Sequence, residues 1–204
     1  GGAMGRTAVG GGYGVESGGG SIEARKILLA ISPMDSPLWP DWARTLKDGG
    51  APIDHVFDAD FEREKMPDFE SAVVIGGGIT GAQLAMALAK RRPGHVTLVT
   101  PHVPRVHRFD SNSGWMGPRN MERFRTEADL ARRREIIRQA RHKGSMPAEV
   151  RGTLRRAAEL GKLAVRVTMV TGATFDGRDL LLDCEDGAPL RAARVILSTG
   201  FEPK

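Results

Sequence analysis

Three glycines, Gly76, Gly78 and Gly81, have the spacing of a dinucleotide-binding turn. In such a turn the first glycine permits a tight bend, the second lets the backbone approach a pyrophosphate, and the third lets a helix pack closely on a strand. The N–H groups at the start of that helix then face the phosphates. We therefore expect a site lined by Gly76, Gly77, Gly78, Ile79, Thr80 and Gly81. The alternative interpretation is a glycine-rich structural turn.

The flanking sequence supplies the elements that must position this turn. Residues 71–75 form an apolar run typical of a buried strand, and residues 82–92 repeat leucine and alanine at helical spacing. Pro93 and Gly94 end the helix, and residues 95–100 indicate a second strand. This strand–helix–strand unit predicts the α/β class: a Rossmann-like FAD/NAD(P)-binding domain with a parallel sheet, flanking helices and β-hairpin (meander) elements.

The end of the second predicted strand bears on which dinucleotide binds. Proteins that bind NAD or FAD usually carry Asp or Glu there, because a carboxylate accepts hydrogen bonds from the ribose hydroxyls. This chain has Thr100 instead, with His102 and Arg105 close behind. An acid would repel a 2′-phosphate, whereas basic side chains bind it. We expect NADP(H) rather than NAD(H), with a solvated loop as the alternative role for Arg105.

Composition narrows the function classes. The 204 residues are 40% hydrophobic and include a single cysteine, Cys184, which excludes an intrachain disulfide and a cysteine-built metal cluster. We expect no metal site, a cytoplasmic location and, since no apolar run could span a bilayer, no membrane partner. Residues 101–160 hold fourteen Arg and Lys against seven Asp and Glu. That basic block suits a phosphorylated ligand, an acidic partner or water, while 5% aromatic content disfavours a stacking surface for nucleic acid.

A strand–turn–strand pattern occurs twice in the chain. One copy spans residues 13–32 and the other residues 179–200, with Ile22 aligned on Leu190 and Ala24 on Ala192. We interpret them as a duplicated unit. Elsewhere we expect a short helix near residues 39–47, helices over residues 127–142 and 147–160 started by Thr126 and Ser145, and a strand over residues 163–170. The first four residues, Gly1 to Met4, are set aside as a tag or linker.

With these residues in place, the chain resembles flavoproteins that have two dinucleotide-binding domains, the group of the flavin-containing monooxygenases and the lysine and ornithine N-hydroxylases. Leu197-Ser-Thr-Gly-Phe201 is similar to the strand ending in Ala-Thr-Gly that marks a crossing between the two domains. Leu29-Ala-Ile-Ser-Pro33 is its counterpart, with Ser32 where glycine is usual. Residues 54–58 resemble the His-containing stretch before the nicotinamide fingerprint, in which Thr80 replaces the commoner serine.

The resemblance implies a domain organisation. Residues 1–32 would be part of an FAD-domain β-hairpin, 33–70 an interdomain crossing segment, 71–200 the inserted NAD(P)H-binding domain, and 201–204 the start of the return. It also adds Thr199 and Gly200 to the cofactor-binding residues. The group's upstream FAD fingerprint is not found in this sequence. We therefore expect FAD only in a complete parent protein, and no activity from this chain alone.

The function that the resemblance implies is the NADP(H)-binding portion of a flavin-dependent, monooxygenase-like oxidoreductase that passes a hydride from NADPH to FAD. Its partners would be the dinucleotide and the missing FAD-domain segments. The alternatives are a dinucleotide-binding module without chemistry and a basic domain that binds nucleic acid or an acidic partner. No catalytic residue is assigned.

Overall fold

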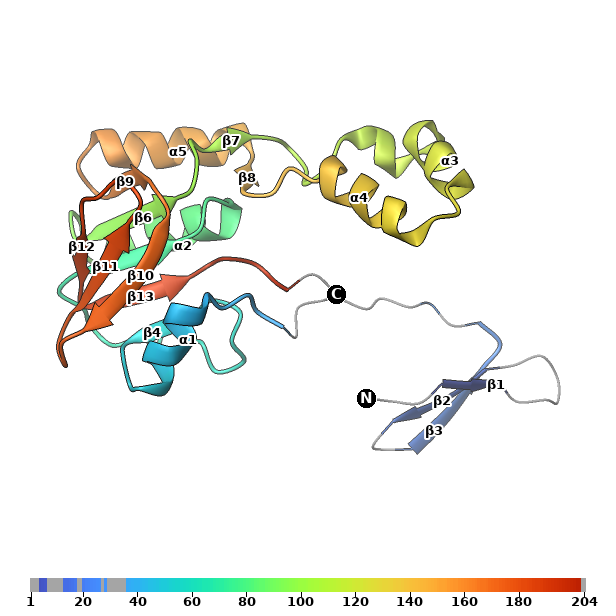
Figure 1. The fold of residues 1–204 in the computed structure, drawn as a ribbon, viewed down its shortest axis with the longest axis horizontal. Helices are drawn as coiled ribbons and strands as arrows, with labels where there is room; N and C mark the ends of the chain where they lie inside the picture. Colours follow the sequence, from blue (N-terminus) through green and yellow to red (C-terminus); the bar gives the residue numbers. More distant parts are fainter. Residues whose placement is uncertain (1–3, 7–12, 18–19, 27, 29–35, 203–204) are drawn as a thin grey trace. The chain divides into compact units, whose positions relative to one another are not determined.

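A five-stranded parallel sheet forms the centre of the computed structural model, which describes residues 4–6, 13–17, 20–26, 28 and 36–202 (Figure 1). The strand order is β4, β13, β5, β6, β9. Their bounds are Ile53–His55, Arg194–Leu197, Ala72–Ile75, Val96–Thr100 and Ala164–Val167, respectively. All four pairings are parallel, which confirms the predicted sheet.

Alternate residues of these strands enter two separate cores. Val74, Leu98 and Ile196 pack with α2 (Ile79–Arg91) and α5 (Ala148–Glu159) on one face. Val73 and Val99 pack on the other face with α1 (Asp41–Asp48) and an antiparallel meander. The meander strands are β10 (Val170–Phe175), β11 (Leu180–Cys184) and β12 (Leu190–Ala192). Burial on both faces explains why the central strands β13, β5 and β6 consist mostly of apolar residues.

The predicted strand–helix–strand unit is present as β5, α2 and β6. The helix, however, begins at Ile79 rather than Ala82, so Gly81 lies inside its first turn. Glycine is tolerated there because the helix approaches the preceding loop too closely for a side chain at Gly81. The loop proper is therefore only Gly76 to Gly78.

The basic region between β6 and α5 differs most from expectation. It contains β7 (Arg105–Val106), the 3₁₀ turn η1 (Ser113–Met116), α3 (Pro118–Thr126), α4 (Leu130–Ala140) and β8 (Ser145–Met146). Thr126 ends α3, which was not predicted, and the side chain of Asp129 caps α4 by accepting from the Ala131 N–H. Ser145 pairs with Arg105 instead of starting α5, which follows Pro147. Gly161, with a φ of +67°, ends α5 as predicted.

Two predicted strands are each broken where the chain changes sheet. The run over residues 163–170 divides into β9 and β10, because Thr168 still donates its N–H to Thr100 while Met169 accepts from Glu185 in the meander. The run from Leu190 divides into β12 and β13 at Ala193, whose N–H donates to the Ser71 hydroxyl at 3.0 Å. A hairpin turn at residues 176–177 joins β10 to β11.

The chain divides into two compact units, Gly1–Asp35 and Ser36–Lys204, each described by itself. The described part of the expected crossing segment over residues 33–70 includes α1, which packs on the sheet, and β4, which is the edge strand of the sheet. Because this stretch is rich in prolines and acidic residues, its sequence did not indicate the three-residue strand β4. The two ends of the second unit pair: Pro37 bridges Phe201, and Leu38 donates its N–H to the Gly200 carbonyl at 2.9 Å.

The first unit is a three-stranded antiparallel meander of β1 (Met4–Arg6), β2 (Tyr13–Ser17) and β3 (Gly20–Ala24). Met4, one of the four residues set aside as a tag or linker, pairs with Val15 in this meander. The predicted second strand ends at Ala24, and most of its expected continuation to Ser32 lies outside the described residues.

The two meanders confirm the predicted duplication and extend it by one strand. Tyr13 pairs with Ala24 as Leu180 pairs with Ala192, and Val15 pairs with Ile22 as Leu182 pairs with Leu190. The additional strands β1 and β10 also agree, since Met4 and Arg6 meet β2 as Ala173 and Phe175 meet β11. One pairing register therefore occurs twice in the chain.

In the part of the chain that the structure describes, no helix has the length and apolar character needed to cross a membrane. Among the same residues, no cluster of three His, Cys, Asp or Glu side chains is arranged to hold a metal ion.

Candidate functional site

Gly76 and Gly81 are glycines because the chain is too tightly packed for side chains at either position. Gly76 follows β5 with a φ of +147°, and a Cβ there would collide with the Ser198 hydroxyl and lie 2.5 Å from the Ser198 carbonyl oxygen. A Cβ at Gly81 would collide with the Gly76 carbonyl and lie 2.6 Å from the Ser198 hydroxyl. The first and third glycines therefore hold β5, α2 and the end of β13 together.

Gly78 has the opposite surroundings. It caps α2 with an extended backbone, and the nearest atom to a Cβ built there is the Gly144 Cα at 3.8 Å. A side chain at Gly78 would therefore make only one ordinary contact, and the first helical turn of α2 carries no acidic residue. Such a helix terminus attracts phosphate. The glycine turn thus fits the pyrophosphate of a dinucleotide.

At the end of β6, Thr100 is fully buried and its hydroxyl donates to the His102 carbonyl. Its side chain therefore stabilises the turn after the strand. The half-buried His102 ring lies beside the glycine turn, since a Cβ at Gly77 would be 3.6 Å from its Cε1. Its Nδ1 donates to the Val103 carbonyl at 3.1 Å, which leaves Nε2 free of a described partner. Arg105 is exposed on β7.

The Ser-Thr-Gly segment after β13 is shared between two regions. Ser198 contacts the glycine turn and donates its hydroxyl to the Ile75 carbonyl at 3.0 Å. Thr199 and Gly200 contact Leu38 instead: the Thr199 hydroxyl donates to the Leu38 carbonyl, and the Gly200 carbonyl accepts the Leu38 N–H at 2.9 Å. Sequence reasoning missed Ser198, although its position directly before Thr199 was an available signal.

His55 lies fully buried at the end of β4, where its ring contacts Thr199 in the segment that follows β13. Its Nδ1 accepts from the Phe57 N–H at 3.2 Å, so Nε2 carries the proton and donates to the Thr199 hydroxyl at 3.1 Å. Burial lowers the pKa of His55, and the Asp58 carboxylate opposes that shift. The neutral ring therefore orders the segment on which Thr199 and Gly200 lie.

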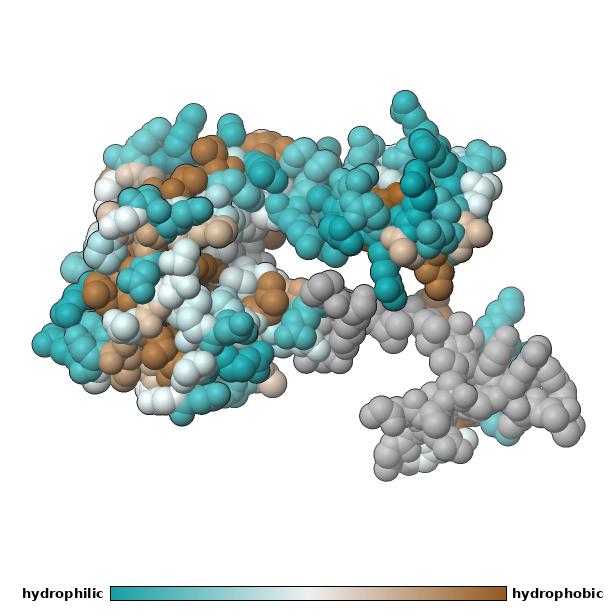
Figure 2. Space-filling view, viewed as in Figure 1, coloured by the Kyte–Doolittle hydropathy of each residue, from teal (hydrophilic) through white to brown (hydrophobic). Residues whose placement is uncertain are grey.

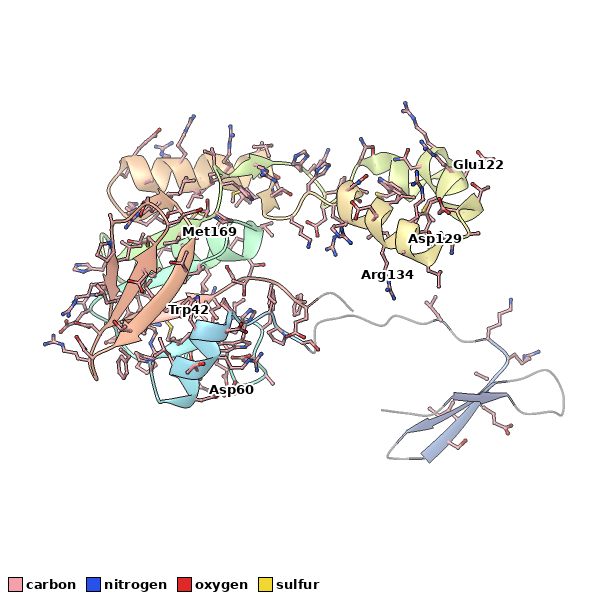
Figure 3. All side chains as sticks on the ribbon, viewed as in Figure 1. Trp42, Asp60, Glu122, Asp129, Arg134 and Met169 are labelled. Atoms are coloured by element: carbon pink, nitrogen blue, oxygen red, sulfur yellow. The ribbon has the colours of Figure 1, made fainter. Side chains whose placement is uncertain are left out.

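The basic block lies on the helices between β7 and β8. No side chain of α3 or α4 is fully buried, and much of the visible surface of these helices is hydrophilic (Figure 2). Arg134 points away from the helix pair, while Asp129 lies at the start of α4 (Figure 3). Arg133 packs within the helix pair, where its Cζ lies 5.3 Å from the centroid of the Phe124 ring. The structure brings none of these helix arginines into contact with the glycine turn.

Comparison with protein families finds one match, the family described as DAO, FAD dependent oxidoreductase, over residues 71–201. The matched stretch runs from the start of β5 to the second crossing and includes the glycine turn. Comparison with curated proteins finds no significant match.

Several solved structures are similar to the chain. An ornithine hydroxylase from Pseudomonas aeruginosa has 18% identity and a TM-score of 0.63, with 95% of this chain and 50% of that chain covered. An L-lysine 6-monooxygenase from Pseudomonas syringae has 14% identity and a TM-score of 0.68, with 95% of this chain and 49% of that chain covered. An ornithine N-hydroxylase from Kutzneria sp. 744 has 18% identity and a TM-score of 0.61, with 95% of this chain and 50% of that chain covered. The likeness establishes the fold, and this chain spans about half the length of those chains.

Proposed function

This chain belongs to the FAD-dependent oxidoreductase family, and from that premise we propose that residues 71–200 are the NADP(H)-binding domain of a flavin-dependent, monooxygenase-like oxidoreductase. The observation that carries the proposal is the glycine turn before α2, whose first helical turn carries no acidic residue, next to a strand that ends in Thr100 rather than an acid. A carboxylate at that strand end is what a bound NAD or FAD ribose would require.

The proposed roles follow the geometry. The N–H groups of the Gly77–Thr80 segment bind the pyrophosphate, and His102 and Arg105 bind the 2′-phosphate. The Thr199–Gly200 segment, ordered by His55, lies toward the nicotinamide end. When bound, NADPH supplies the hydride that reduces a flavin. The residues of this chain bind and orient the cofactor, and none is proposed to transfer a proton.

The arrangement of the crossings supports an inserted domain. Residues 36–38 and 200–202 lie side by side and antiparallel, as the two ends of an insertion must. The meander β1–β3 repeats the register of β10–β12, which suits a second nucleotide-binding domain to which residues 1–32 contribute. The flavin partner and the substrate of a complete protein are part of this proposal.

Calorimetric titration of the chain with NADPH tests the site. We expect Gly78→Val to abolish measurable binding, because the side chain would occupy the space in front of the helix terminus. Gly117→Val is the matched control: Gly117 also caps a helix with an extended backbone, and a Cβ there has nothing within 4 Å. Equal affinities of the parent chain and Gly78→Val would refute the site.

A second candidate is FAD at the same glycine turn, and the family match favours it. The buried Thr100 argues against it, because an FAD ribose would lack its usual carboxylate partner. Parallel titration with FAD separates the two. Saturable FAD binding that is lost in Gly78→Val, without NADPH binding, would favour this second candidate.

A further inference from the structure

The helix-pair segment is the part of the chain from β7 to β8 that carries α3 and α4. Its returning limb, residues 141–146, lies against the glycine turn. After α4 the chain forms β8, which pairs in parallel with β7 (Figure 1). The limb between α4 and β8 contains Gly144, which is 66 positions from Gly78 in the sequence and yet has its Cα 3.8 Å from the Cβ position of Gly78. Sequence reasoning gave this glycine no role.

The limb is fixed on both sides of Gly144. On one side, Ser145 pairs with Arg105, and Met146 accepts the His107 N–H at 3.1 Å. On the other side, the His142 N–H donates to the Asp110 carbonyl at 2.6 Å. The His107 and His142 rings stack with centroids 3.7 Å apart and an interplanar angle of 8°. Gly144 therefore has little freedom to move.

The surroundings of Gly144 require glycine for two reasons. Its φ of +69° lies in the left-handed region, and a Cβ would lie 2.9 Å from the His102 Nε2 and 3.1 Å from the His102 Cε1. The His102 ring thus occupies the space between Gly144 and Gly77. A side chain at position 144 would require the His102 ring to shift, because the ring is the movable end of its side chain.

We propose that Gly144 is a positioning residue of the dinucleotide site, which by lacking a side chain leaves room for the His102 ring beside the glycine turn, where the ring would contact a bound 2′-phosphate. This inference rests on the proposed function. It makes the helix-pair segment part of the cofactor site, because the segment's returning limb sets the place of a ligand-binding side chain. The preference for NADPH over NADH thus depends on a residue that does not contact the cofactor.

The test compares Gly144→Asn with Gly161→Asn in the whole chain. Asparagine adopts the left-handed region more readily than other non-glycine residues, so both variants carry similar small backbone strain. Gly161 has a φ of +67° and nothing within 4 Å of a Cβ, which makes it the matched control. Calorimetry measures NADPH and NADH affinity, and NMR reports the His102 ring signals without cofactor. Thermal unfolding shows that each variant is folded, and Gly144→Ala replaces Gly144→Asn if it is not.

We expect Gly144→Asn to weaken NADPH binding about ten-fold, the value of one charge-assisted contact, while NADH affinity changes by less than about two-fold. The His102 ring signals should shift in Gly144→Asn and not in Gly161→Asn. In a His102→Ala background, adding Gly144→Asn should cause no further loss of NADPH affinity.

Unshifted His102 signals, or an unchanged preference for NADPH in Gly144→Asn, would overturn the inference even if the parent chain binds NADPH normally. A parent chain that binds neither nucleotide would instead refute the proposed function, and the NMR comparison would still decide whether Gly144 places the ring.

Discussion

At the scale of single residues, the glycines of the turn differ in how closely they are packed. A Cβ at Gly76 or Gly81 would collide with the Ser198 hydroxyl or the Gly76 carbonyl, whereas a Cβ at Gly78 would make only an ordinary contact with the Gly144 Cα. Thr100 belongs to the closely packed part of the site, because its side chain is buried and its hydroxyl donates a hydrogen bond to the His102 carbonyl. A glutamate at position 100 would bury a carboxylate and destabilise the fold, so cofactor preference is better tested at the exposed basic residues.

Arg105→Ala is expected to weaken NADPH binding about ten-fold to hundred-fold and to leave NADH binding nearly unchanged, because a charge-assisted bond to the 2′-phosphate contributes about 1.5–3 kcal/mol. Calorimetry with both nucleotides measures the difference. Arg134→Ala is the control, since it removes an equal charge from α4, where Arg134 points away from the helix pair. Equal losses for NADPH and NADH would show that Arg105 does not recognise the 2′-phosphate.

His55 predicts a pH dependence of stability. Its pKa in the folded chain is lowered from 6.5 by burial, so between the two values the unfolded state binds more protons. The unfolding free energy should therefore decrease as the pH falls below about 6.5 and level off below the folded pKa. Protonation would place a second donor on Nδ1, facing the Phe57 N–H that now donates to it.

Urea unfolding across this pH range measures the effect, with His55→Gln as the comparison because it removes the titrating ring. The variant should be less stable at neutral pH and show a smaller slope. An identical slope in the variant would assign the pH dependence to the other four histidines.

At the scale of elements, the sequence predicted what short-range patterns determine. The strands β5 and β6 were predicted from their apolar runs, which are buried on both faces, and helix α2 from the helical spacing of its buried leucines and alanines. Helix α3 gave no such signal, since it buries no residue and has only Pro118 at its start as an indication.

Long-range contacts explain the remaining differences. The break between β12 and β13 depends on the Ser71 hydroxyl, which lies 122 positions from Ala193 in the sequence. The position of Gly144 beside Gly78 likewise depends on how the helix-pair segment returns to the sheet. The candidate site was therefore predictable at the glycine turn, and not at the residues that other segments bring to it.

Alanine substitutions at two helical glycines are expected to change the stability of the chain in opposite directions. Gly81→Ala should destabilise the chain by about 2 kcal/mol or more, because its Cβ would collide with the Gly76 carbonyl and α2 would move from the sheet. Gly152→Ala in α5 should stabilise it by about 0.5–1 kcal/mol, since nothing lies within 4 Å of that Cβ and alanine favours the helix. Urea unfolding measures both. A neutral Gly81→Ala would mean that α2 does not need the third glycine for packing.

At the scale of the whole molecule, the chain combines one complete parallel sheet with two meanders of the same register. Only the second meander continues, within the described residues, into a strand of that sheet, β13. The glycine turn of this sheet is the dinucleotide fingerprint that the chain places between a strand and a helix. If that turn binds NADP(H), a flavin needs a second site.

The 204-residue chain, purified alone, is therefore expected to be colourless, to bind NADPH and not to oxidise it. The physical reason is that hydride transfer needs an acceptor, and the glycine turn cannot hold NADPH and FAD at once. Absorbance of the purified chain measures bound flavin, and the decrease in NADPH absorbance with added free FAD measures turnover. Gly78→Val distinguishes the two cofactors at the turn, because it should remove whichever one binds there. If the chain is yellow with flavin near one-to-one, and the flavin is lost in Gly78→Val, the turn binds FAD. Thr100 at the end of β6 would then not indicate a preference for NADP(H).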